Sequence, residues 1–550
     1  MQQFSGRASA KTLKSMPTPV APSPSYVGAL GEQTTLPAII DLRAEATPDD
    51  CFATLGGRSL TFAQALQRAE SAAGALASLG VRKGDKVAIM LPNSVEFIDL
   101  WFASALLGAV IVPVNTQLRG EGLRYIVDHC DADVCVVDAQ LVEQYEFAVP
   151  AGAGPSQRFV RGGEASTSWT PVEDILSGDH SPAPRAEVEP EDLASVLYTS
   201  GTTGLPKGVM TCHNAYAATG FEYAQRYVRL RADDVLYTCL PLFHSNAQAI
   251  TTVPSLLSGR PMVMSSRFSA SGFLDEMRSH GATVFNYIGA MLTILLKQPE
   301  RPDDADNPIR LTVGSSAPRE GWTDFERRFG IQIVEIYGLT ETAGVCLASP
   351  PDDVRVGKCG VPVSWSEVQI HNDEATEAGP DEPGEFVIRS RRPNVMFRGY
   401  YKDPDATAKA MAGGWFHSGD RGRRSPDGYF EFIDRLKDSI RRRGENISSF
   451  EVERVVNSHP AVAESAAVGV PSELGEEDVM IVVVPREAAE VGPAELVEFC
   501  AERMAAFMVP RYVRTVDTLP KTPTQKVQKF ALRDADLGSA WDRLAPGERR

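Results

Sequence analysis

A loop rich in glycine and hydroxyl side chains is the segment of the sequence that most clearly carries chemistry. Residues 197–210 read Leu-Tyr-Thr-Ser-Gly-Thr-Thr-Gly-Leu-Pro-Lys-Gly-Val-Met and follow an apolar run at 193–197 that predicts a strand. Glycines permit close backbone approach, and converging amides with hydroxyl and lysine donors bind phosphate. It is not a Walker A loop, because no Gly-Lys-Ser/Thr occurs at the required spacing. We predict a phosphate-binding turn, with a flexible surface turn as the alternative; its candidate ligands are Thr199, Ser200, Gly201, Thr202, Thr203, Gly204 and Lys207.

Alternating strand-like and helical segments from about residue 35 to 345 must position this loop. Short apolar runs at 87–91 and 134–137 predict buried strands, and the patterns at 62–79 and 120–130 predict helices. The apolar stretch 97–114 is interrupted by Asp99, divided by Gly108 and ended by Pro113, which favours a buried helix (96–107) and a buried strand (109–114) over a membrane span. This alternation is typical of parallel sheets with helical crossovers.

The pattern changes in the second half of the chain. Segments 385–389 and 429–433 are short, bounded by turns and β-like, and a compact α+β unit follows from about 436, with helices at 450–459 and 493–504 and strands at 465–470 and 479–484. Segment 150–190 reads as irregular surface chain. We predict an α/β fold with a large multi-sheet N-terminal domain, containing parallel sheets with helical crossovers plus a β-rich subdomain, and a small mobile α+β C-terminal domain. The expected boundaries are a flexible N-terminal segment (1–30), a large domain (31–436) and a small C-terminal domain (437–550).

Composition excludes several classes of protein. The 550 residues include 55 Lys and Arg against 72 Asp and Glu, a net charge of −17, so a duplex nucleic acid is an unfavourable partner. The 8 cysteines show no repeated spacing that would predict a zinc site. The first thirty residues contain prolines and lysines but no apolar core, so they do not predict a secretion signal. We expect a cytoplasmic protein without a membrane span.

Six motifs, in one order, resemble those of the adenylate-forming superfamily of acyl-CoA synthetases, peptide-synthetase adenylation domains and firefly luciferase. After the loop at 198–210 they are Leu-Pro-Leu-Phe-His-Ser-Asn (240–246), Tyr-Gly-Leu-Thr-Glu-Thr (337–342), Trp-Phe-His-Ser-Gly-Asp (415–420), Arg-Leu-Lys-Asp-Ser-Ile (435–440) and Leu-Pro-Lys-Thr-Pro-Thr-Gln-Lys (519–526). The resemblance spans about 35–534, and the small domain resembles the branch with crotonobetaine/carnitine-CoA ligase-like enzymes. It implies attack of a carboxylate on the α-phosphate of ATP with Mg²⁺, release of pyrophosphate, and transfer of the acyl group to coenzyme A.

The resemblance also implies roles for individual residues. The implied catalytic residues are Lys526, Thr340, Glu341 and His244, with Glu341 as the Mg²⁺ ligand. The implied nucleotide ligands, besides the loop, are Ser315, Ser316, Ala317, Tyr337, Gly338, Asp420 and Arg435. The implied acid pocket comprises His244, Asn246, Tyr287, Ile288, Gly289, Ala290, Gly314, Gly338 and Ala343, and several of these are small enough to suggest room for a medium-sized or aromatic acid. Without the resemblance, Glu341 is typical of a helix start, Asp420 of a Gly-Asp turn and His244 of a buried core.

For the second half-reaction the resemblance implies rotation of the small domain about Lys437, which brings Arg443, Gly444 and Glu445 towards the thiol. Two residues depart from the family pattern: Arg443 and Gln525 both stand where the family has glycine. The run 441–443 is consistent either with binding of the coenzyme A phosphates or with a solvated charged surface.

We therefore predict an ATP-dependent, AMP-forming acid–thiol ligase that makes an acyl-CoA thioester through acyl-AMP. Its partners would be a small carboxylic acid and ATP, and the protein would be a monomer or homodimer. One alternative changes the acceptor to a carrier-protein thiol, an amine, or nitrite activated for diazotisation of an aromatic amine. A second alternative is a catalytically silent nucleotide-binding protein, whose sign would be loss of Lys526, Glu341 or Asp420; all three are present.

Overall fold

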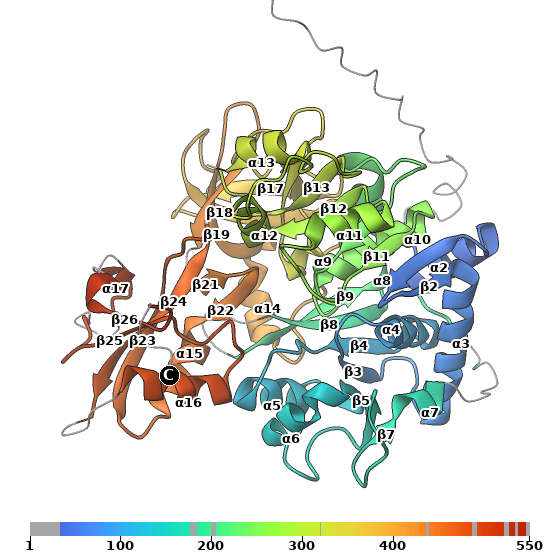
Figure 1. The fold of residues 1–550 in the computed structure, drawn as a ribbon, viewed down its shortest axis with the longest axis horizontal. Helices are drawn as coiled ribbons and strands as arrows, with labels where there is room; N and C mark the ends of the chain where they lie inside the picture. The colour runs from blue at the N-terminus through green and yellow to red at the C-terminus, as the bar shows by residue number, and fades with distance from the viewer. Residues whose placement is uncertain are drawn as a thin grey trace, which may run out of the picture.

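The computed structural model describes residues 33–176, 183, 185–199, 205–319, 321–435, 439–486, 492–521, 527–533 and 537–545. The predicted N-terminal segment 1–30 lies outside this part of the chain. Two large sheets, a smaller antiparallel sheet and a separate C-terminal unit make up the fold, which confirms the predicted α/β class (Figure 1). Within the described residues no helix combines the length and apolarity that a bilayer crossing needs.

The first large sheet has seven strands in the order β7-β6-β5-β3-β4-β8-β9, and all its neighbours are parallel except the antiparallel pair β8 and β9. Its strands are β3 (Lys86–Met90), β4 (Val110–Pro113), β5 (Ala132–Asp138), β6 (Gln157–Arg161), β7 (Thr170–Pro171), β8 (Leu193–Thr199) and β9 (Lys207–Cys212). The prediction of irregular chain for 150–190 was wrong in part: β6 pairs in parallel with β5, because Phe159 and Val160 are apolar and buried there.

The second large sheet has nine strands in the order β16-β15-β14-β13-β12-β10-β11-β1-β2, and the neighbours from β14 to β1 are parallel. Its strands are β1 (Cys51–Leu55), β2 (Arg58–Thr61), β10 (Leu236–Thr238), β11 (Met262–Met264), β12 (Val284–Ile288), β13 (Leu311–Ser315), β14 (Gln332–Tyr337), β15 (Leu347–Ala348) and β16 (Val361–Pro362). Parallel strands place their carboxyl ends at one edge, so residues that follow β12, β13 and β14 can meet there.

Helices cover these sheets, and their ends follow local chemistry. The α-helices are α2 (Leu36–Ala46), α3 (Phe62–Ser78), α4 (Val95–Leu107), α5 (Gly120–His129), α6 (Val142–Ala148), α7 (Val172–Leu176), α8 (His213–Glu222), α9 (Ser245–Ala247), α10 (Val253–Ser258), α11 (Phe273–His280), α12 (Gly289–Leu296) and α13 (Trp322–Phe329). Helix α4 begins after Ser94, whose hydroxyl accepts from the Phe97 amide, and ends at Gly108 with φ 65°. Every residue of α4 is buried, which confirms the predicted buried helix. Asp99 is accommodated there by a bidentate ion pair with Arg68.

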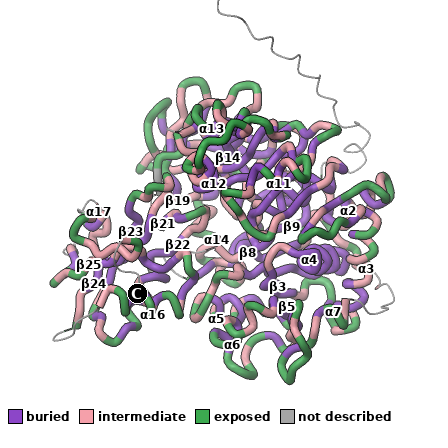
Figure 2. Tube along the Cα trace, in the orientation of Figure 1, coloured by how far each residue is buried: buried purple, intermediate pink, exposed green. Residues whose placement is uncertain are grey.

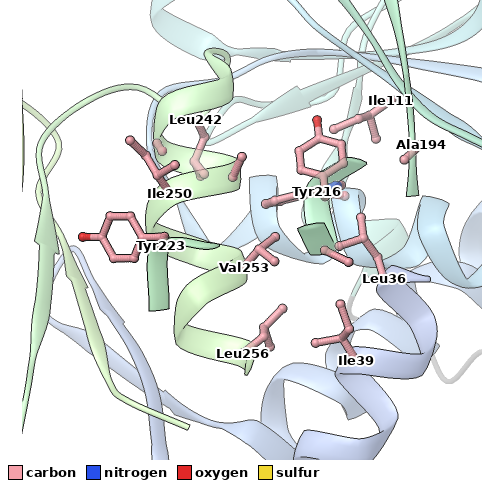
Figure 3. Packing of buried hydrophobic residues seen from close by; sticks show 14 of the residues in the cluster. Leu36, Ile39, Ile111, Ala194, Tyr216, Tyr223, Leu242, Ile250, Val253 and Leu256 are labelled. Atoms are coloured by element: carbon pink, nitrogen blue, oxygen red, sulfur yellow. The ribbon is translucent and has the colours of Figure 1, made fainter. Parts of the chain in front are cut away.

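One core joins the two large sheets. Side chains from α2, β4, β8, α8 and α10 meet in it (Figure 3), and Tyr223 lies at its margin with the hydroxyl pointing away from the labelled aliphatic groups. Short helical segments complete this region: η1 (Ala139–Leu141), the π-helical turns η2 (Tyr223–Tyr227) and η3 (Gln248–Thr252), and the 3₁₀ turn η4 (Thr340–Thr342). Buried chain runs through the interior of both sheets (Figure 2). The core therefore fixes the two sheets relative to each other.

The β-rich part and the C-terminal unit follow. The antiparallel sheet comprises β17 (Ser366–His371), β18 (Gly384–Ser390), β19 (Phe416–Arg424) and β20 (Phe430–Arg435), with α14 (Pro404–Ala410) and η5 (Ala412–Gly414) between β18 and β19. The C-terminal unit comprises β21 (Ser439–Arg442), β22 (Glu445–Ser448), α15 (Ser449–Asn457), β23 (Val462–Pro471), β24 (Glu477–Pro485), α16 (Pro493–Arg503), β25 (Tyr512–Thr515), α17 (Phe530–Arg533), η6 (Leu537–Ser539) and β26 (Trp541–Asp542). It has its own apolar clusters and lies at one side of the molecule, in orange and red in Figure 1.

Candidate nucleotide and acyl site

The predicted phosphate loop closes an antiparallel hairpin. Strand β8 ends at Thr199 and β9 begins at Lys207, and these two residues face each other in the ladder. The loop therefore follows a strand, as expected. Ser200, Gly201, Thr202, Thr203 and Gly204 lie outside the described residues.

A tyrosine connects this hairpin to the predicted magnesium motif. The Nζ of Lys207 lies 4.7 Å from the centre of the Tyr400 ring. The Tyr400 hydroxyl donates to Oε1 of Glu341 over 2.8 Å. Tyr400 was not predicted from the sequence, because its position depends on backbone pairing of 398–401 with β9, including a hydrogen bond of 2.7 Å from the Tyr401 amide to the Gly208 carbonyl.

Glu341 fits a magnesium ligand that acts together with substrate. Its side chain is mostly buried, and its backbone carbonyl accepts from the Phe397 amide over 2.9 Å, so the 3₁₀ turn η4 is anchored. Among the described residues, no group of three or more His, Cys, Asp and Glu side chains could hold a metal ion by itself. Mg²⁺ accepts few carboxylates when phosphate oxygens and water complete its octahedron, so a single Glu341 suits Mg²⁺ that arrives with ATP.

Tyr337 and Asp420 form a buried pair at the predicted ribose and base position. The Tyr337 hydroxyl donates to Oδ2 of Asp420 over 2.8 Å, and the Tyr337 ring stacks on Phe386 with centroids 4.7 Å apart. The expected Gly-Asp turn is not observed: Asp420 lies within strand β19, and Gly419, with φ 72°, falls at an irregularity between the pairing of β18 with His417 and its pairing with Arg421. In that ladder Asp420 faces Arg435 of β20 in backbone register.

The candidate adenine segment follows β13, as predicted. Ser315 ends the strand, Ser316 is exposed with φ 66°, and Ala317 follows. Both the Ser316 and Ala317 amides donate to the carboxylate of Glu335, a β14 residue that the sequence analysis did not identify. Nothing in its local pattern separates Glu335 from an ordinary strand residue, since the contact depends on the register of β13 with β14.

The glycines of the predicted acid pocket were expected to leave room for the acid, but they are small because neighbouring backbone packs against them. A Cβ at Gly289 would lie 1.8 Å from the Ser316 carbonyl oxygen, one at Gly314 would lie 2.0 Å from the Tyr287 carbonyl oxygen, and one at Gly338 would lie 2.3 Å from the Gly344 carbonyl oxygen. Neighbouring backbone thus occupies the position that a Cβ would take at each glycine. The small size of these residues is therefore not evidence of space for a substrate. Of the other candidates, Tyr287, Ala290 and Ala343 are buried, and Ala343 caps η4 with φ 52°.

A buried asparagine organises the region behind Asn246. The Asn286 amide nitrogen lies 3.1 Å from the Ile250 carbonyl, 2.5 Å from the Thr251 hydroxyl and 3.1 Å from Oδ1 of Asn246, and its oxygen accepts from Tyr223. Ile250 and Thr251 belong to the π-helical turn η3, and Tyr223 begins the other π-helical turn, η2. Such turns occur often at functional sites. Asn286 was not predicted from the sequence, although an Asn inside an apolar strand was a visible signal.

His244 and Glu445 bring the C-terminal unit to this region. Nε2 of His244 and Oε1 of Glu445 are 2.9 Å apart. Burial alone would raise the pKa of Glu445, but the charge and hydrogen bond of His244, the charge of Arg441 and a hydrogen bond from Asn115 outweigh it and lower that pKa. The Glu445 carboxylate is therefore held ionised between the two parts of the chain.

Gly444 contacts the large domain directly. A Cβ at Gly444, which has φ 81°, would lie 2.6 Å from the Ile288 side chain, and the Gly444 amide donates to Glu476 over 3.1 Å. The predicted thiol-side segment and the predicted pocket residue Ile288 are thus in contact. Arg443 has φ 52°, so it adopts the left-handed conformation that glycine takes more readily.

The three arginines do not share one environment. Arg442 is buried, forms an ion pair with Asp478 at 2.9 Å and donates to the carbonyls of Phe507 and Val509. Arg441 donates to Asn446, and Arg443 is exposed. The run is therefore neither a uniform phosphate site nor a uniform solvated surface, since its middle residue is structural.

A few polar contacts complete the junction between the C-terminal unit and the large domain. Lys297 Nζ donates to the Glu473 carbonyl over 2.9 Å, and Arg454 pairs with Glu121 at 3.2 Å. The Arg503 carbonyl approaches Gly120, where a Cβ would lie 2.7 Å away. The catalytic and hinge candidates Lys526 and Lys437 lie outside the described residues.

Comparison with known proteins places this geometry in context. Residues 40–401 match the family described as AMP-binding enzyme, and residues 451–526 match its C-terminal domain. A crotonobetaine/carnitine–CoA ligase of Salmonella heidelberg is 32% identical over 490 residues, which cover 86% of this chain and 93% of the relative.

Two solved proteins extend the comparison. A double mutant of o-succinylbenzoate CoA synthetase from Bacillus subtilis, bound to a CoA product analogue, superposes with a TM-score of 0.81 at 27% identity, covering 91% of this chain and 99% of that one. The same synthetase with AMP gives a TM-score of 0.65 at the same identity and coverage. An amide bond synthetase from Marinactinospora thermotolerans gives 0.79 at 26% identity, covering 90% and 99%.

Proposed function

The chain belongs to the AMP-binding enzyme family and is an ATP-dependent acyl-CoA synthetase, and we propose how its own residues divide the two half-reactions between them. In the first, a carboxylic acid attacks the α-phosphate of ATP to give acyl-AMP and pyrophosphate. In the second, the thiol of coenzyme A displaces AMP. Both steps bring anions together, so placed donors and cations supply most of the catalysis.

For adenylation, the large domain would hold the nucleotide. The hairpin loop would bind the phosphates, Glu341 would bind the Mg²⁺ that arrives with ATP, and Asp420 would accept hydrogen bonds from the ribose hydroxyls beside Tyr337. The contacts from Lys207 to Tyr400 and from Tyr400 to Glu341 support a common frame for phosphates and metal. Thr340 lies in the same turn and would donate to the α-phosphate.

For thioester formation, the contact between His244 and Glu445 carries the proposal. It joins the motif that would gate the acid to the segment that would receive the thiol, and Gly444 packs on Ile288 beside it. The higher TM-score against the synthetase bound to a CoA product analogue, compared with the same synthetase bound to AMP, supports this assignment. We therefore assign the described arrangement of the two domains to the second half-reaction.

Adenylation then requires a second arrangement. We propose that rotation about Lys437 separates Glu445 from His244 and carries Lys526 to the α-phosphate, where its ammonium offsets the repulsion between carboxylate and phosphate. The boundary between the large domain (31–436) and the lid (437–550) would lie at this hinge.

The acid itself is proposed to carry a hydrogen-bond acceptor. The Asn286 nitrogen has two hydrogens and three acceptors within 3.1 Å, the Ile250 carbonyl, the Thr251 hydroxyl and Oδ1 of Asn246, so the oxygen and not the amide nitrogen of Asn246 faces Asn286. Asn246 then presents its own amide nitrogen as a donor, and its side chain is half-buried. A carbonyl, hydroxyl or ether on the acyl chain would accept that donor.

The test is a panel of carboxylic acids in matched pairs, with and without such an acceptor. Pyrophosphate release with ATP alone measures adenylation, and mass spectrometry after addition of coenzyme A measures the thioester. Acids with an acceptor should give higher kcat/KM, and Asn246→Ala should reduce that preference. Pyrophosphate release without any thioester, across all active acids, would contradict coenzyme A as the acceptor.

One observation favours a second acceptor. The amide bond synthetase resembles this chain nearly as closely as the CoA synthetase does, so an amine in place of coenzyme A is the second candidate. Arg443, in the acceptor-side segment, departs from the family pattern and adopts a left-handed conformation. The same panel with a set of amines, scored for amide by mass, distinguishes the two.

A further inference from the structure

Glu335 contacts the candidate adenine segment and accepts three hydrogen bonds. The Ser316 amide donates to Oε1 over 2.6 Å, the Ala317 amide donates to Oε2 over 3.2 Å, and the Tyr287 hydroxyl also donates to Oε2. Only 7% of Glu335 is exposed, and Tyr287 is fully buried. All three partners are donors, so the arrangement favours the ionised carboxylate, which has no proton of its own to place among them.

The segment that Glu335 holds is strained. Ser316 has φ 66°, a region that costs a non-glycine residue free energy unless its surroundings over-determine it. On the other side, the Ser316 carbonyl fits against Gly289 at a distance that no Cβ would allow. Glu335 and Gly289 therefore hold the same residue from two directions.

Building on the proposed function, we propose that Glu335 is a positioning residue for ATP: its ionised carboxylate holds Ser316 and Ala317 in the conformation that binds adenine, and protonation releases them. Glu335 does not touch the reacting atoms in this scheme. Its effect passes through two backbone amides and is therefore expected on KM for ATP much more than on kcat.

The site also makes this carboxylate sensitive to pH near neutrality. Burial raises the pKa of Glu335 to about 7, although hydrogen bonds from Tyr287, Ala317 and Ser316 oppose the shift. The titratable groups that face it are Tyr287 of β12 and Cys359 before β16. Burial, reinforced by the Glu335 charge, raises the pKa of Cys359 to about 12 and raises that of Tyr287 well above its usual value, so both stay neutral while Glu335 titrates.

The test measures KM for ATP by pyrophosphate release between pH 5.5 and 8.5. In the natural protein, KM should rise as pH falls below about 7, by up to tenfold per unit for one proton, while kcat changes little. Glu335→Gln keeps the shape but offers one acceptor oxygen for three donors, so KM should be about tenfold higher at pH 8 and flat with pH. Calorimetric titration with ATP alone should give the same pattern in Kd.

Two variants isolate the cause. Tyr287→Phe removes a donor that lowers the Glu335 pKa, so the rise in KM should begin at a higher pH. Glu326→Gln is the matched control, because the Glu326 carboxylate also accepts a backbone amide of strand β14, that of Ile333 at 3.0 Å, but it lies away from the adenine segment. Its pH profile should equal that of the natural protein.

The outcomes separate the two proposals. A natural protein that releases no pyrophosphate with any acid would overturn the proposed function. An active protein whose pH-dependent KM survives in Glu335→Gln would overturn the positioning role. If Glu335→Gln fails to fold, the profile of Tyr287→Phe decides, and an unshifted profile overturns the role.

Discussion

The candidate nucleotide site and the junction with the C-terminal unit differ in how far their charged side chains are buried. Glu335, Glu341 and Asp420 are only 7%, 8% and 2% exposed, and each accepts from a tyrosine hydroxyl. At the junction, the side chains of His244 and Glu121 are 40% and 70% exposed, and those of their partners Glu445 and Arg454 are 15% and 30% exposed. The carboxylates of the candidate nucleotide site are thus part of the buried interior, whereas each ion pair at the junction has a partner that water can reach.

This difference suits an enzyme with two half-reactions. Buried, hydrogen-bonded carboxylates keep their geometry without reorganisation, which is what electrostatic catalysis requires. Exposed ion pairs contribute about 0–1 kcal/mol each, so a junction built from a few of them can open on the timescale of domain motions. The two regions should therefore respond differently to substitution.

The largest effect is expected where the second arrangement would bring the lid onto the nucleotide. Lys526→Ala should reduce adenylate formation by roughly a thousandfold, because the cation between two anions is lost. Thioester formation from supplied acyl-AMP should stay largely intact. Pyrophosphate release and single-turnover thioester formation measure the two steps, and equal losses in both would contradict the two-arrangement scheme.

The next largest effect should fall on stability, within the buried polar network of the large domain. Asn286→Leu leaves the Ile250 carbonyl and the Tyr223 hydroxyl without this partner, which should cost about 2–4 kcal/mol. A thermal melt should show the loss, and the acyl-chain preference should weaken. Val284→Ala, on the same strand and buried but apolar, is the control: it should destabilise without changing the acid preference.

A smaller and selective effect is expected at the junction. Glu445→Gln replaces the ionised partner of His244, so thioester formation should slow by about five- to tenfold while pyrophosphate release keeps its rate. Rapid-quench measurements with preformed acyl-AMP resolve the second step. If adenylation slows equally, the contact between His244 and Glu445 does not belong to the second half-reaction alone.

The smallest effect is expected at the most exposed contact. Arg454→Ala removes the pair with Glu121 and should change the thioester rate by about twofold or less, an effect that 0.5 M salt should abolish. A large, salt-independent loss would show that the junction is not the weak, exchangeable contact inferred above. Arg124→Ala, at a neighbouring exposed arginine of α5 paired with Asp128 on its own helix, serves as the control.

Local patterns were sufficient to predict most of the fold. The helix α4 has a serine cap at its start and Gly108 at its end, so its bounds could be read from the sequence. The order of the six motifs was enough to identify the family. Asp420 was misjudged because a Gly-Asp pair often forms a turn, whereas here Gly419 lies at an irregularity inside β19, and pairing is present again with β20 at Asp420 and with β18 at Arg421.

The residues that were missed depend on pairing across distance. Tyr400 meets Glu341 at a separation of 59 residues. His244 and Glu445 were both predicted as site residues, but their contact, at a separation of 201 residues, was not. Glu335 and Asn286 act through the register of neighbouring strands, which no local periodicity specifies. Prediction from sequence therefore named the candidate ligand-binding motifs but not the side chains that contact them.

The lack of a side chain at Gly444 limits which substitutions this position can accept. Ile288 fills the place where a methyl group would stand, so alanine there would obstruct the docked pose of the lid. The second arrangement, proposed for adenylation, would separate Gly444 from Ile288 and would not be affected by the added methyl group. Substitution at one position can thus slow the transfer of an activated acyl group while sparing its activation, and the intermediate would accumulate on an otherwise intact catalyst.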